Sequence, residues 1–154
     1  DPQNPLAALK TTSRAEYVYA RLEARRAGAD DALFLTIDDH LSESTSANIF
    51  LVRTAVGGAV ELATPSLDCA ILPGTTRSWL LGWAALVGLR PHEGQLTTAD
   101  LAAADEAFLS SSVAGVLPVT AFDGTPIGDG RPGAWTLRAR GDRESMIRGE
   151  DHDR

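Results

Sequence analysis

Cysteine is almost absent from this sequence, with Cys69 as the only one among 154 residues. A single thiol forms no internal disulfide, and a chain of this length can bury a core without one, so the composition fits the reducing cytoplasm. Histidines are few as well, and His40, His92 and His152 are scattered without the ligand spacing of a zinc site. We therefore expect a cytoplasmic protein with no metal centre.

The sequence also lacks a long apolar run and an excess of positive charge. The longest apolar run, at 79–89, has 11 residues, whereas a bilayer span needs about 20. The 14 Lys and Arg residues are outnumbered by 21 Asp and Glu, which gives a formal net charge of -7. Such a surface does not supply the basic footprint that nucleic acid or anionic lipid requires. We therefore expect one globular domain with no nucleic-acid or membrane partner.

Lysine is the rarest cation here, because 13 of the 14 basic residues are arginine and Lys10 is the exception. A lysine amine can lose a proton and add to a carbonyl, whereas a guanidinium stays charged and is not nucleophilic. The alternative is a solvated loop lysine, which composition alone favours. Lys10 is therefore a candidate catalytic residue only if other segments support it.

Apolar periodicity and turn residues predict helices alternating with groups of strands. The expected helices cover 14–26, 73–88, about 97–104 and 133–146, and the expected strands cover 32–37, 48–53, 59–63, 108–110 and 116–122. Ser13 and Glu16 have the spacing of a capping box, and Gly57-Gly58 predicts a hairpin turn. Because the strands come in hairpin-like groups without strict βαβ alternation, we expect an α+β fold with a mixed, mostly antiparallel sheet packed with helices.

Two hydroxyl-rich segments are candidate anion sites. The segment Leu72–Arg77 reads Leu-Pro-Gly-Thr-Thr-Arg and opens a predicted helix, whose first turn presents free N–H groups to an anion. Ser110, Ser111 and Ser112 follow a predicted strand, and their hydroxyls and amides can line the same anion. An ordinary N-capping threonine and a polar serine loop are the alternatives.

A carboxylate completes the set. Glu43 lies in what the sequence predicts to be a hydroxyl-rich bend between two apolar strands. A carboxylate held there can pair with a cationic ring nitrogen, and the alternative is a solvent-facing turn glutamate. A lone lysine, a carboxylate and a phosphate cup are together the parts needed to hold pyridoxal phosphate.

The order of these parts resembles the fold-type IV, or class IV, pyridoxal-phosphate enzymes, which include branched-chain and D-amino-acid aminotransferases and aminodeoxychorismate lyases. The resemblance runs from about Leu9 to Arg143. It is carried by Lys10-Thr11, by Glu43 through Asn48-Ile49-Phe50, by Leu72 through Arg77, by Ala104 through Ser110, by Leu117-Pro118-Val119 and Asp123-Gly124, and by Gly128 through Gly133. It implies the fold of the large domain of D-amino-acid aminotransferase-like enzymes, with residues 9–147 as a C-terminal cofactor-binding domain.

The resemblance assigns a role to nine residues. Lys10 is similar to the lysine that binds the cofactor covalently and then moves the substrate's Cα proton. Glu43 is similar to the glutamate that binds the pyridine nitrogen, and Leu72 to the apolar residue that packs on the ring. The phosphate would contact Thr75, Thr76, Ser111 and Ser112, and the substrate carboxylate would face Val113 and Ala114.

The sequence departs from the family pattern at three points. Ser44 stands where glycine usually follows the glutamate, and Thr75 stands where the helix start usually has isoleucine. Ala15 takes the place, five residues after the lysine, of the tyrosine that branched-chain aminotransferases carry near the cofactor's phenolic oxygen. Tyr17 and Tyr19 are the available substitutes.

The resemblance implies an aminotransferase of the branched-chain or D-amino-acid type, which moves an amino group between an amino acid and a 2-oxo acid. The alternatives are a 4-amino-4-deoxychorismate lyase that releases pyruvate, and an inactive fragment or binding module that retains the fold. Family members are homodimers with a smaller N-terminal domain. Because the chain opens on Asp1-Pro2 close to the lysine, we expect 1–8 to be an irregular lead-in from such a missing domain and 148–154 to be a polar tail.

Overall fold

A seven-stranded sheet forms the centre of the computed structural model, which describes residues 1–4, 6, 9–55 and 57–149. Strand β3 lies in the middle, with β4 and β5 on one side and β6 and β7 on the other, and β2 and β1 extend from its start. All pairings are antiparallel except that of β4 with β5. The sheet strands are β1 (Leu33–Leu35), β2 (Leu41–Ser44), β3 (Asn48–Thr54), β4 (Val60–Pro65), β5 (Arg90–Gly94), β6 (Glu106–Ser111) and β7 (Gly115–Val119).

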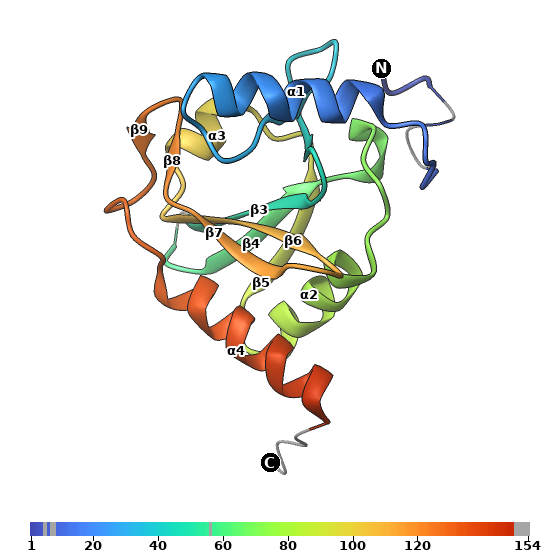
Figure 1. The fold of residues 1–154 in the computed structure, drawn as a ribbon. Helices are drawn as coiled ribbons and strands as arrows, with labels where there is room; N and C mark the ends of the chain where they lie inside the picture. The colour runs from blue at the N-terminus through green and yellow to red at the C-terminus, as the bar shows by residue number, and fades with distance from the viewer. Residues whose placement is uncertain (5, 7–8, 56, 150–154) are drawn as a thin grey trace.

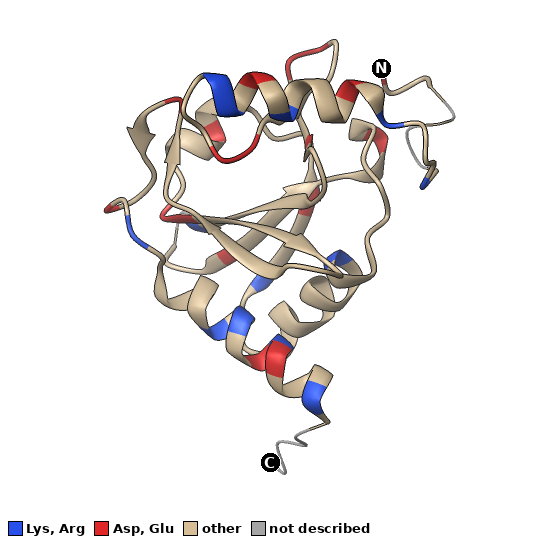
Figure 2. Ribbon diagram, viewed as in Figure 1, with Lys and Arg blue, Asp and Glu red and all other residues tan. Residues whose placement is uncertain are grey.

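The remaining elements lie on both sides of this sheet (Figure 1). A small hairpin, β8 with β9, follows β7. The bounds are α1 (Ala15–Arg26), the 3-10 turn η1 (Leu67–Cys69), α2 (Thr75–Leu86), α3 (Thr98–Ala102), β8 (Ala121–Phe122), β9 (Thr125–Pro126) and α4 (Ala134–Arg148). Charged residues lie mainly on the helices and turns, and most strand residues are uncharged (Figure 2). The expected α+β fold with a mostly antiparallel sheet is confirmed.

Strand β3 is buried on both faces, because its alternate side chains enter two different cores. Phe50 and Val52 contribute to the core under α2 and α4, where Phe50 stacks on Phe108 at a ring-centroid distance of 5.3 Å. Ile49 and Leu51 contribute to the core on the α3 side. The rigid, doubly packed β3 therefore anchors whatever side chains lie at its ends.

Helix α4 is fixed to the sheet by polar contacts as well as by apolar ones. The carboxylate of Glu106, on β6, accepts hydrogen bonds from the backbone N–H groups of Trp135 and Thr136 at 3.0 and 2.8 Å. Gly133 is required beside it, since a Cβ there would lie 1.9 Å from the Glu106 side chain. The indole N–H of Trp83, on α2, donates to Asp142 on α4 at 2.8 Å. Helices α2 and α4 thus cover one face together.

Helix α1 differs from α2 and α4 because none of its residues is buried. It crosses the opposite side of the molecule from α4 (Figure 1). Val18 and Leu22 on this helix are 60% and 46% exposed, although both are apolar. The helix therefore leaves an apolar strip in solvent, close to the segment that carries Lys10.

The structure corrects three local expectations. The capping box of Ser13 and Glu16 is wrong: α1 begins at Ala15 with Arg14 as its N-cap, so Glu16 is the second helical residue and no side chain caps the helix. Glu43 lies in strand β2, so the bend predicted there is wrong. Strand β5 has no counterpart among the predicted strands. The last helix continues to Arg148 into the expected tail, and residues 5, 7–8 and 150–154 of the lead-in and tail lie outside the described part.

No helix of the described residues is long and apolar enough to cross a membrane. Within the same residues, no three His, Cys, Asp or Glu side chains lie close enough together to bind a metal ion.

Candidate active site

One cavity of about 530 Å³, the main cavity, brings together all nine residues singled out from the sequence. They come from the segment before α1, from β2, from the turn that opens α2, and from the end of β6 with its following turn. These residues are Lys10, Glu43, Leu72, Thr75, Thr76, Ser111, Ser112, Val113 and Ala114. The sequence segments that suggested a common site therefore converge in space.

Glu43 is nearly inaccessible, with 5% of its surface exposed. Its Oε2 accepts a hydrogen bond from the backbone N–H of Leu72 at 2.9 Å and from Nδ2 of Asn48 at 3.3 Å. The hydroxyl of Tyr17 lies 3.5 Å from Oε1. Burial raises the pKa of Glu43 above its ordinary value, while the Leu72 N–H, the nearby Arg14 charge and the Tyr17 hydroxyl act in the opposite direction. A buried carboxylate of this kind is suited to pairing with a cationic group in the cavity.

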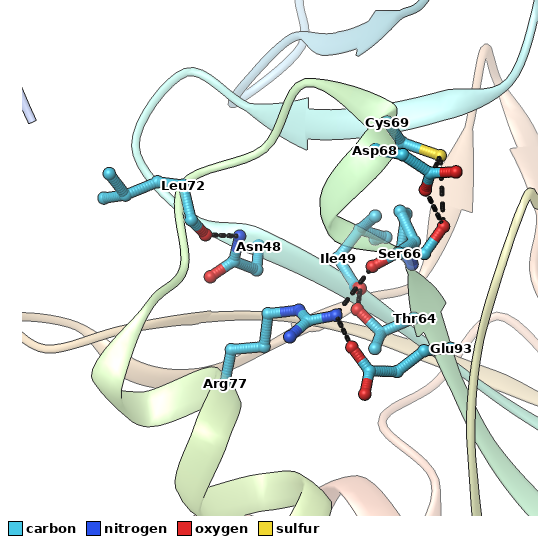
Figure 3. Close-up of polar contacts among 10 residues, drawn as sticks. Asn48, Ile49, Thr64, Ser66, Asp68, Cys69, Leu72, Arg77 and Glu93 are labelled. Carbon is cyan, nitrogen blue, oxygen red and sulfur yellow. Dashed lines mark hydrogen bonds and ion pairs between the residues drawn. The ribbon is translucent and has the colours of Figure 1, made fainter. Parts of the chain in front are cut away.

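Asn48 links the carboxylate to the turn that opens α2, a role the sequence did not reveal. Its Nδ2 donates to Glu43. It also donates, at 2.9 Å, to the backbone oxygen of Leu72 (Figure 3). Gly74 passes so close that a Cβ there would lie 2.3 Å from Oδ1 of Asn48. The sequence signal for this role is an asparagine at the start of an otherwise apolar strand.

The first turn of α2 forms a cup of polar groups. Gly74 is its N-cap and no side chain caps the helix, so the first N–H groups have no partner within the helix. Thr75 and Ser112 share a hydrogen bond of 3.0 Å between their hydroxyls. The hydroxyls of Thr76 and Ser110 are buried and, among the described residues, have no hydrogen-bond partner. Buried hydroxyls are normally satisfied, so these two have hydrogen-bonding capacity left for a water molecule or a bound ligand.

Ser110 and Ser111, which both line the main cavity, differ in the contacts of their hydroxyls. The hydroxyl of Ser111 accepts a hydrogen bond from the N–H of Ala114 at 3.1 Å, so that amide is already engaged within the turn. Ser110, which received no role from the resemblance, also lines the main cavity, and its buried hydroxyl has no hydrogen-bond partner among the described residues. Val113 lines the cavity but is 99% exposed.

Arg77 connects the cup at the start of α2 to the sheet. It is buried, and its Nη2 donates to the backbone oxygen of Pro65 at 2.8 Å and to Oε2 of Glu93 at 2.5 Å (Figure 3). These partners belong to β4 and β5, so one side chain joins the first turn of α2 to two strands. On the far side of the same region, Ser66, Asp68 and the buried Cys69 form a separate set of contacts (Figure 3).

A second cavity of about 420 Å³, the adjacent cavity, lies against the first. Arg14, Glu43 and Leu72 are the three described residues that line both. Tyr17 lines only the adjacent cavity, where it contacts Phe34 at a ring-centroid distance of 5.0 Å. Tyr19 lines neither cavity and is 59% exposed. Lys10 lies in the wall of the main cavity, on the exposed segment before α1.

The sequence matches the amino-transferase class IV family over residues 1–122. A branched-chain-amino-acid aminotransferase of Escherichia coli (strain K12) is 33% identical over 132 residues, which are 86% of this chain and 41% of that protein. A solved branched-chain amino acid aminotransferase from Escherichia coli is similar over 99% of this chain and 50% of its own, with a TM-score of 0.89 and 30% identity.

Two further solved structures show the same likeness. The branched-chain amino acid aminotransferase of Thermobaculum terrenum in its PLP-form has a TM-score of 0.87 and 28% identity over 94% of this chain and 46% of its own. A Legionella pneumophila protein provisionally assigned as a 4-amino-4-deoxychorismate lyase has a TM-score of 0.83 and 29% identity, over 98% of this chain and 52% of its own. The chain spans about half, or less, of the length of these proteins.

Proposed function

Because the chain belongs to the class IV aminotransferase family, we propose that it is the cofactor-binding part of a pyridoxal-phosphate-dependent aminotransferase. The observation that carries this proposal is the pair of unpaired buried hydroxyls, on Thr76 and Ser110, in a cavity that also contains Lys10 and the buried Glu43. An amine, an anion cup and a buried carboxylate in one cavity match the three parts of pyridoxal phosphate that a protein must hold: aldehyde, phosphate and ring nitrogen.

The residues present fit this cofactor. The open N–H groups at the start of α2 would hold the phosphate, together with the hydroxyls of Thr75, Thr76, Ser110 and Ser112. Ser111 belongs to the same wall but directs its hydroxyl oxygen to the Ala114 amide. When bound, pyridoxal phosphate supplies an aldehyde that combines with amines and a ring that accepts electrons from the substrate's Cα.

The chain's own residues would then perform three tasks. Lys10 would bond to the cofactor, give way to the substrate amine, and move the Cα proton through its Nζ atom. Glu43 would hold a proton on the ring nitrogen, since a carboxylate stabilises the adjacent cation. Leu72 would pack on the ring, and the turn at Val113 and Ala114 would face the substrate carboxylate. We expect an amino acid and a 2-oxo acid as substrates, of the branched-chain or D-amino-acid type.

Absorbance spectroscopy tests the cofactor assignment. The full-length gene product, mixed with pyridoxal phosphate, should develop a visible absorbance band that disappears in Lys10→Ala. Lys10→Arg is the matched control, because it keeps the charge without a nucleophilic amine and should also lack the band. A wild-type protein without a lysine-dependent band would instead support the inactive fragment or binding module.

A 4-amino-4-deoxychorismate lyase is the second candidate, favoured by the similarity to the Legionella pneumophila structure over 98% of this chain. Both reactions would use Lys10 and Glu43, so these residues do not discriminate between them. The deciding assay compares pyruvate release from aminodeoxychorismate with amino transfer from L- and D-amino acids. Pyruvate release without transfer would replace the aminotransferase proposal by the lyase.

We also propose a homodimer in the cytoplasm, with a smaller N-terminal domain ahead of the residues described. The exposed apolar side chains of α1, including Val18 and Leu22, are a surface that such a domain or a second subunit could cover. Sedimentation of the full-length gene product should give twice the monomer mass. A monomer with full activity would contradict the dimer.

A further inference from the structure

The wall between the two cavities has three described residues, and the proposed function uses only two of them. Glu43 and Leu72 would contact the cofactor ring, one at its nitrogen and one at its face. Arg14 is the third. A residue in the same wall as two ring contacts is well placed to contact the ring as well.

The guanidinium of Arg14 is held in a defined orientation. Its Cζ atom lies 4.1 Å from the centroid of the Tyr17 ring, in a cation–π contact. Its Nη2 donates to the backbone oxygen of Thr45 at 3.0 Å. Although Arg14 is the N-cap residue of α1, its side chain makes no capping hydrogen bond. The orientation is therefore set by Tyr17 and Thr45, on the side of Glu43.

Most of the hydrogen-bonding capacity of this guanidinium remains available. An arginine has five N–H donors, and within the described residues the Thr45 oxygen accepts from one nitrogen only. No carboxylate of the described part lies within 4.0 Å of Arg14 as an ion-pair partner. The charge of Arg14 is nevertheless close enough to Glu43 to act toward a lower pKa of that carboxyl group. An oriented, unpaired cation in a cavity wall is a site for an anionic oxygen.

Other charged and titratable groups around the wall do not supply this function. Glu16 and Asp31 are themselves acidic, and the Tyr17 hydroxyl points to Glu43. Arg21 lines the main cavity two helical turns further along α1, but it does not line the adjacent cavity and so lies outside the shared wall. Tyr19, offered by the sequence as a hydroxyl near the ring, lines neither cavity.

We propose that Arg14 binds the ionised oxygen of the cofactor ring, so that the ring is held at its nitrogen by Glu43 and at its oxygen by Arg14. This inference rests on the proposed function for the identity of the ring. A substrate carboxylate offers the same chemistry, and the experiment below separates the two sources.

Ligand pairs that differ by one anionic oxygen test the assignment. Fluorescence titration of the full-length gene product measures the dissociation constants of pyridoxal 5'-phosphate and of its 3-O-methyl ether, which lacks the ionisable ring oxygen. The Lys10→Ala background keeps binding non-covalent, so the result does not depend on catalysis. We expect the protein with Arg14 to prefer the parent compound by about 10- to 100-fold, as a charged hydrogen bond does, and Arg14→Met to lose that preference.

Two variants control for folding and for charge in general. Arg14→Lys keeps the charge without the planar donors and should retain part of the preference. Arg25→Met removes an arginine from the last turn of α1, which lines neither cavity, and should leave the preference intact. Circular dichroism shows whether each variant is folded.

The same preference in Arg14→Met and in the parent protein would overturn the proposal, and so would a parent protein that does not distinguish the two compounds. A second pair, an amino acid and the amine that lacks its carboxylate, reports on the other source. If Arg14→Met changes only the second preference, Arg14 binds the substrate and the ring assignment is wrong. Absence of a Lys10-dependent band contradicts the proposed function alone.

Discussion

At the scale of single residues, Glu43 combines two properties that oppose each other. Its burial makes the carboxylate unfavourable, and its contacts with Leu72, Asn48 and Tyr17 hold it in one position. In the absence of a cationic ligand, the folded protein therefore binds a proton at Glu43 more tightly than the unfolded chain does. Stability from this group is present at acidic pH and is lost as pH rises from the ordinary value of 4.5 through the raised pKa.

We therefore predict opposite effects of Glu43→Gln on stability and on activity. At neutral pH the cofactor-free variant should melt a few degrees higher than wild type, because a buried charge is removed. Its turnover should fall roughly 100-fold, since the ring nitrogen loses its charged partner. The variant should also lose the pH dependence of stability that Glu43 contributes, because glutamine does not titrate. Calorimetry at several pH values and turnover assays measure these effects.

Glu23→Gln is the control for that variant, because Glu23 is exposed on α1 and lines neither cavity. It should change neither the melting temperature nor the pH profile. Equal turnover in Glu43→Gln and wild type would mean that Glu43 does not contact the ring.

Gly74 is a position where a single methyl group should matter. In Gly74→Ala the new Cβ would lie 2.3 Å from Oδ1 of Asn48, so that side chain must move and its bonds to Glu43 and Leu72 weaken. We expect a loss of about 1–3 kcal/mol in stability and weaker binding of pyridoxal phosphate. Chemical denaturation and fluorescence titration measure the two.

Gly82→Ala, in the same helix, is the matched comparison. A Cβ at Gly82 has no atom of the described residues within 4 Å, and alanine is the better helix former, so stability should rise by about 0.5–1 kcal/mol. Similar behaviour of the two variants would contradict the close approach at Gly74.

At the scale of elements, α1 is the least supported helix. It has 12 residues, none buried, and isolated helices of that length are marginal in water. We predict that its amides exchange with deuterium much faster than those of β3 in this 154-residue chain. Addition of a domain or subunit that covers Val18 and Leu22 should slow the exchange. Protection of α1 equal to that of β3 in the isolated chain would refute this expectation.

Arg77 holds the start of α2 to strands β4 and β5. Arg77→Met would leave the backbone oxygen of Pro65 without this donor and release Glu93. We expect a loss of about 1–3 kcal/mol together with weaker phosphate binding, measured by denaturation and by titration with inorganic phosphate. Arg90→Met is the control, because Arg90 is exposed on β5. Unchanged phosphate binding in Arg77→Met would mean that the cup forms without this anchor.

Much of the fold was predictable where sequence patterns were strong. The apolar run of β3 and the glycine pair before β4 each produced the expected strand. The short helix expected at about 97–104 is α3, which Thr97 begins in a capping box with Asp100. Strand β5 was missed because residues 90–94 read Arg-Pro-His-Glu-Gly, with no alternation and mostly exposed side chains. Its place is set by the crossover through α2, which local patterns do not contain.

The candidate site was predictable as a set of residues but not as a network. Its segments have distinctive composition, so the lysine, the carboxylate and the cup could each be found. The bond from Asn48 to Leu72 joins residues 24 positions apart, and no local pattern encodes such a distance. The same reason hid the roles of Ser110 and Arg14, whose importance lies in which hydrogen-bonding groups remain unpaired after folding.

At the scale of the whole molecule, ligand binding should be coupled to global stability. The proposed cofactor contacts join β2, the start of α2 and the end of β6, and these elements belong to one continuous sheet with its covering helix. A ligand at 100 times its dissociation constant stabilises the folded state by about 2.7 kcal/mol. We predict that pyridoxal phosphate raises the melting temperature of wild type more than that of Lys10→Arg, in scanning calorimetry. An equal rise would show that Lys10 adds nothing to binding.

The bridge made by Asn48 has a consequence for which ligands the protein accepts. Because one amide group ties the carboxylate of Glu43 to the turn that begins α2, the separation between these two binding points is fixed by the fold and does not adjust to the ligand. For the proposed cofactor, the main cavity would therefore set the distance between the ring nitrogen and the phosphate. We expect a compound with one more methylene between ring and phosphate to bind more weakly, although it carries the same chemical groups.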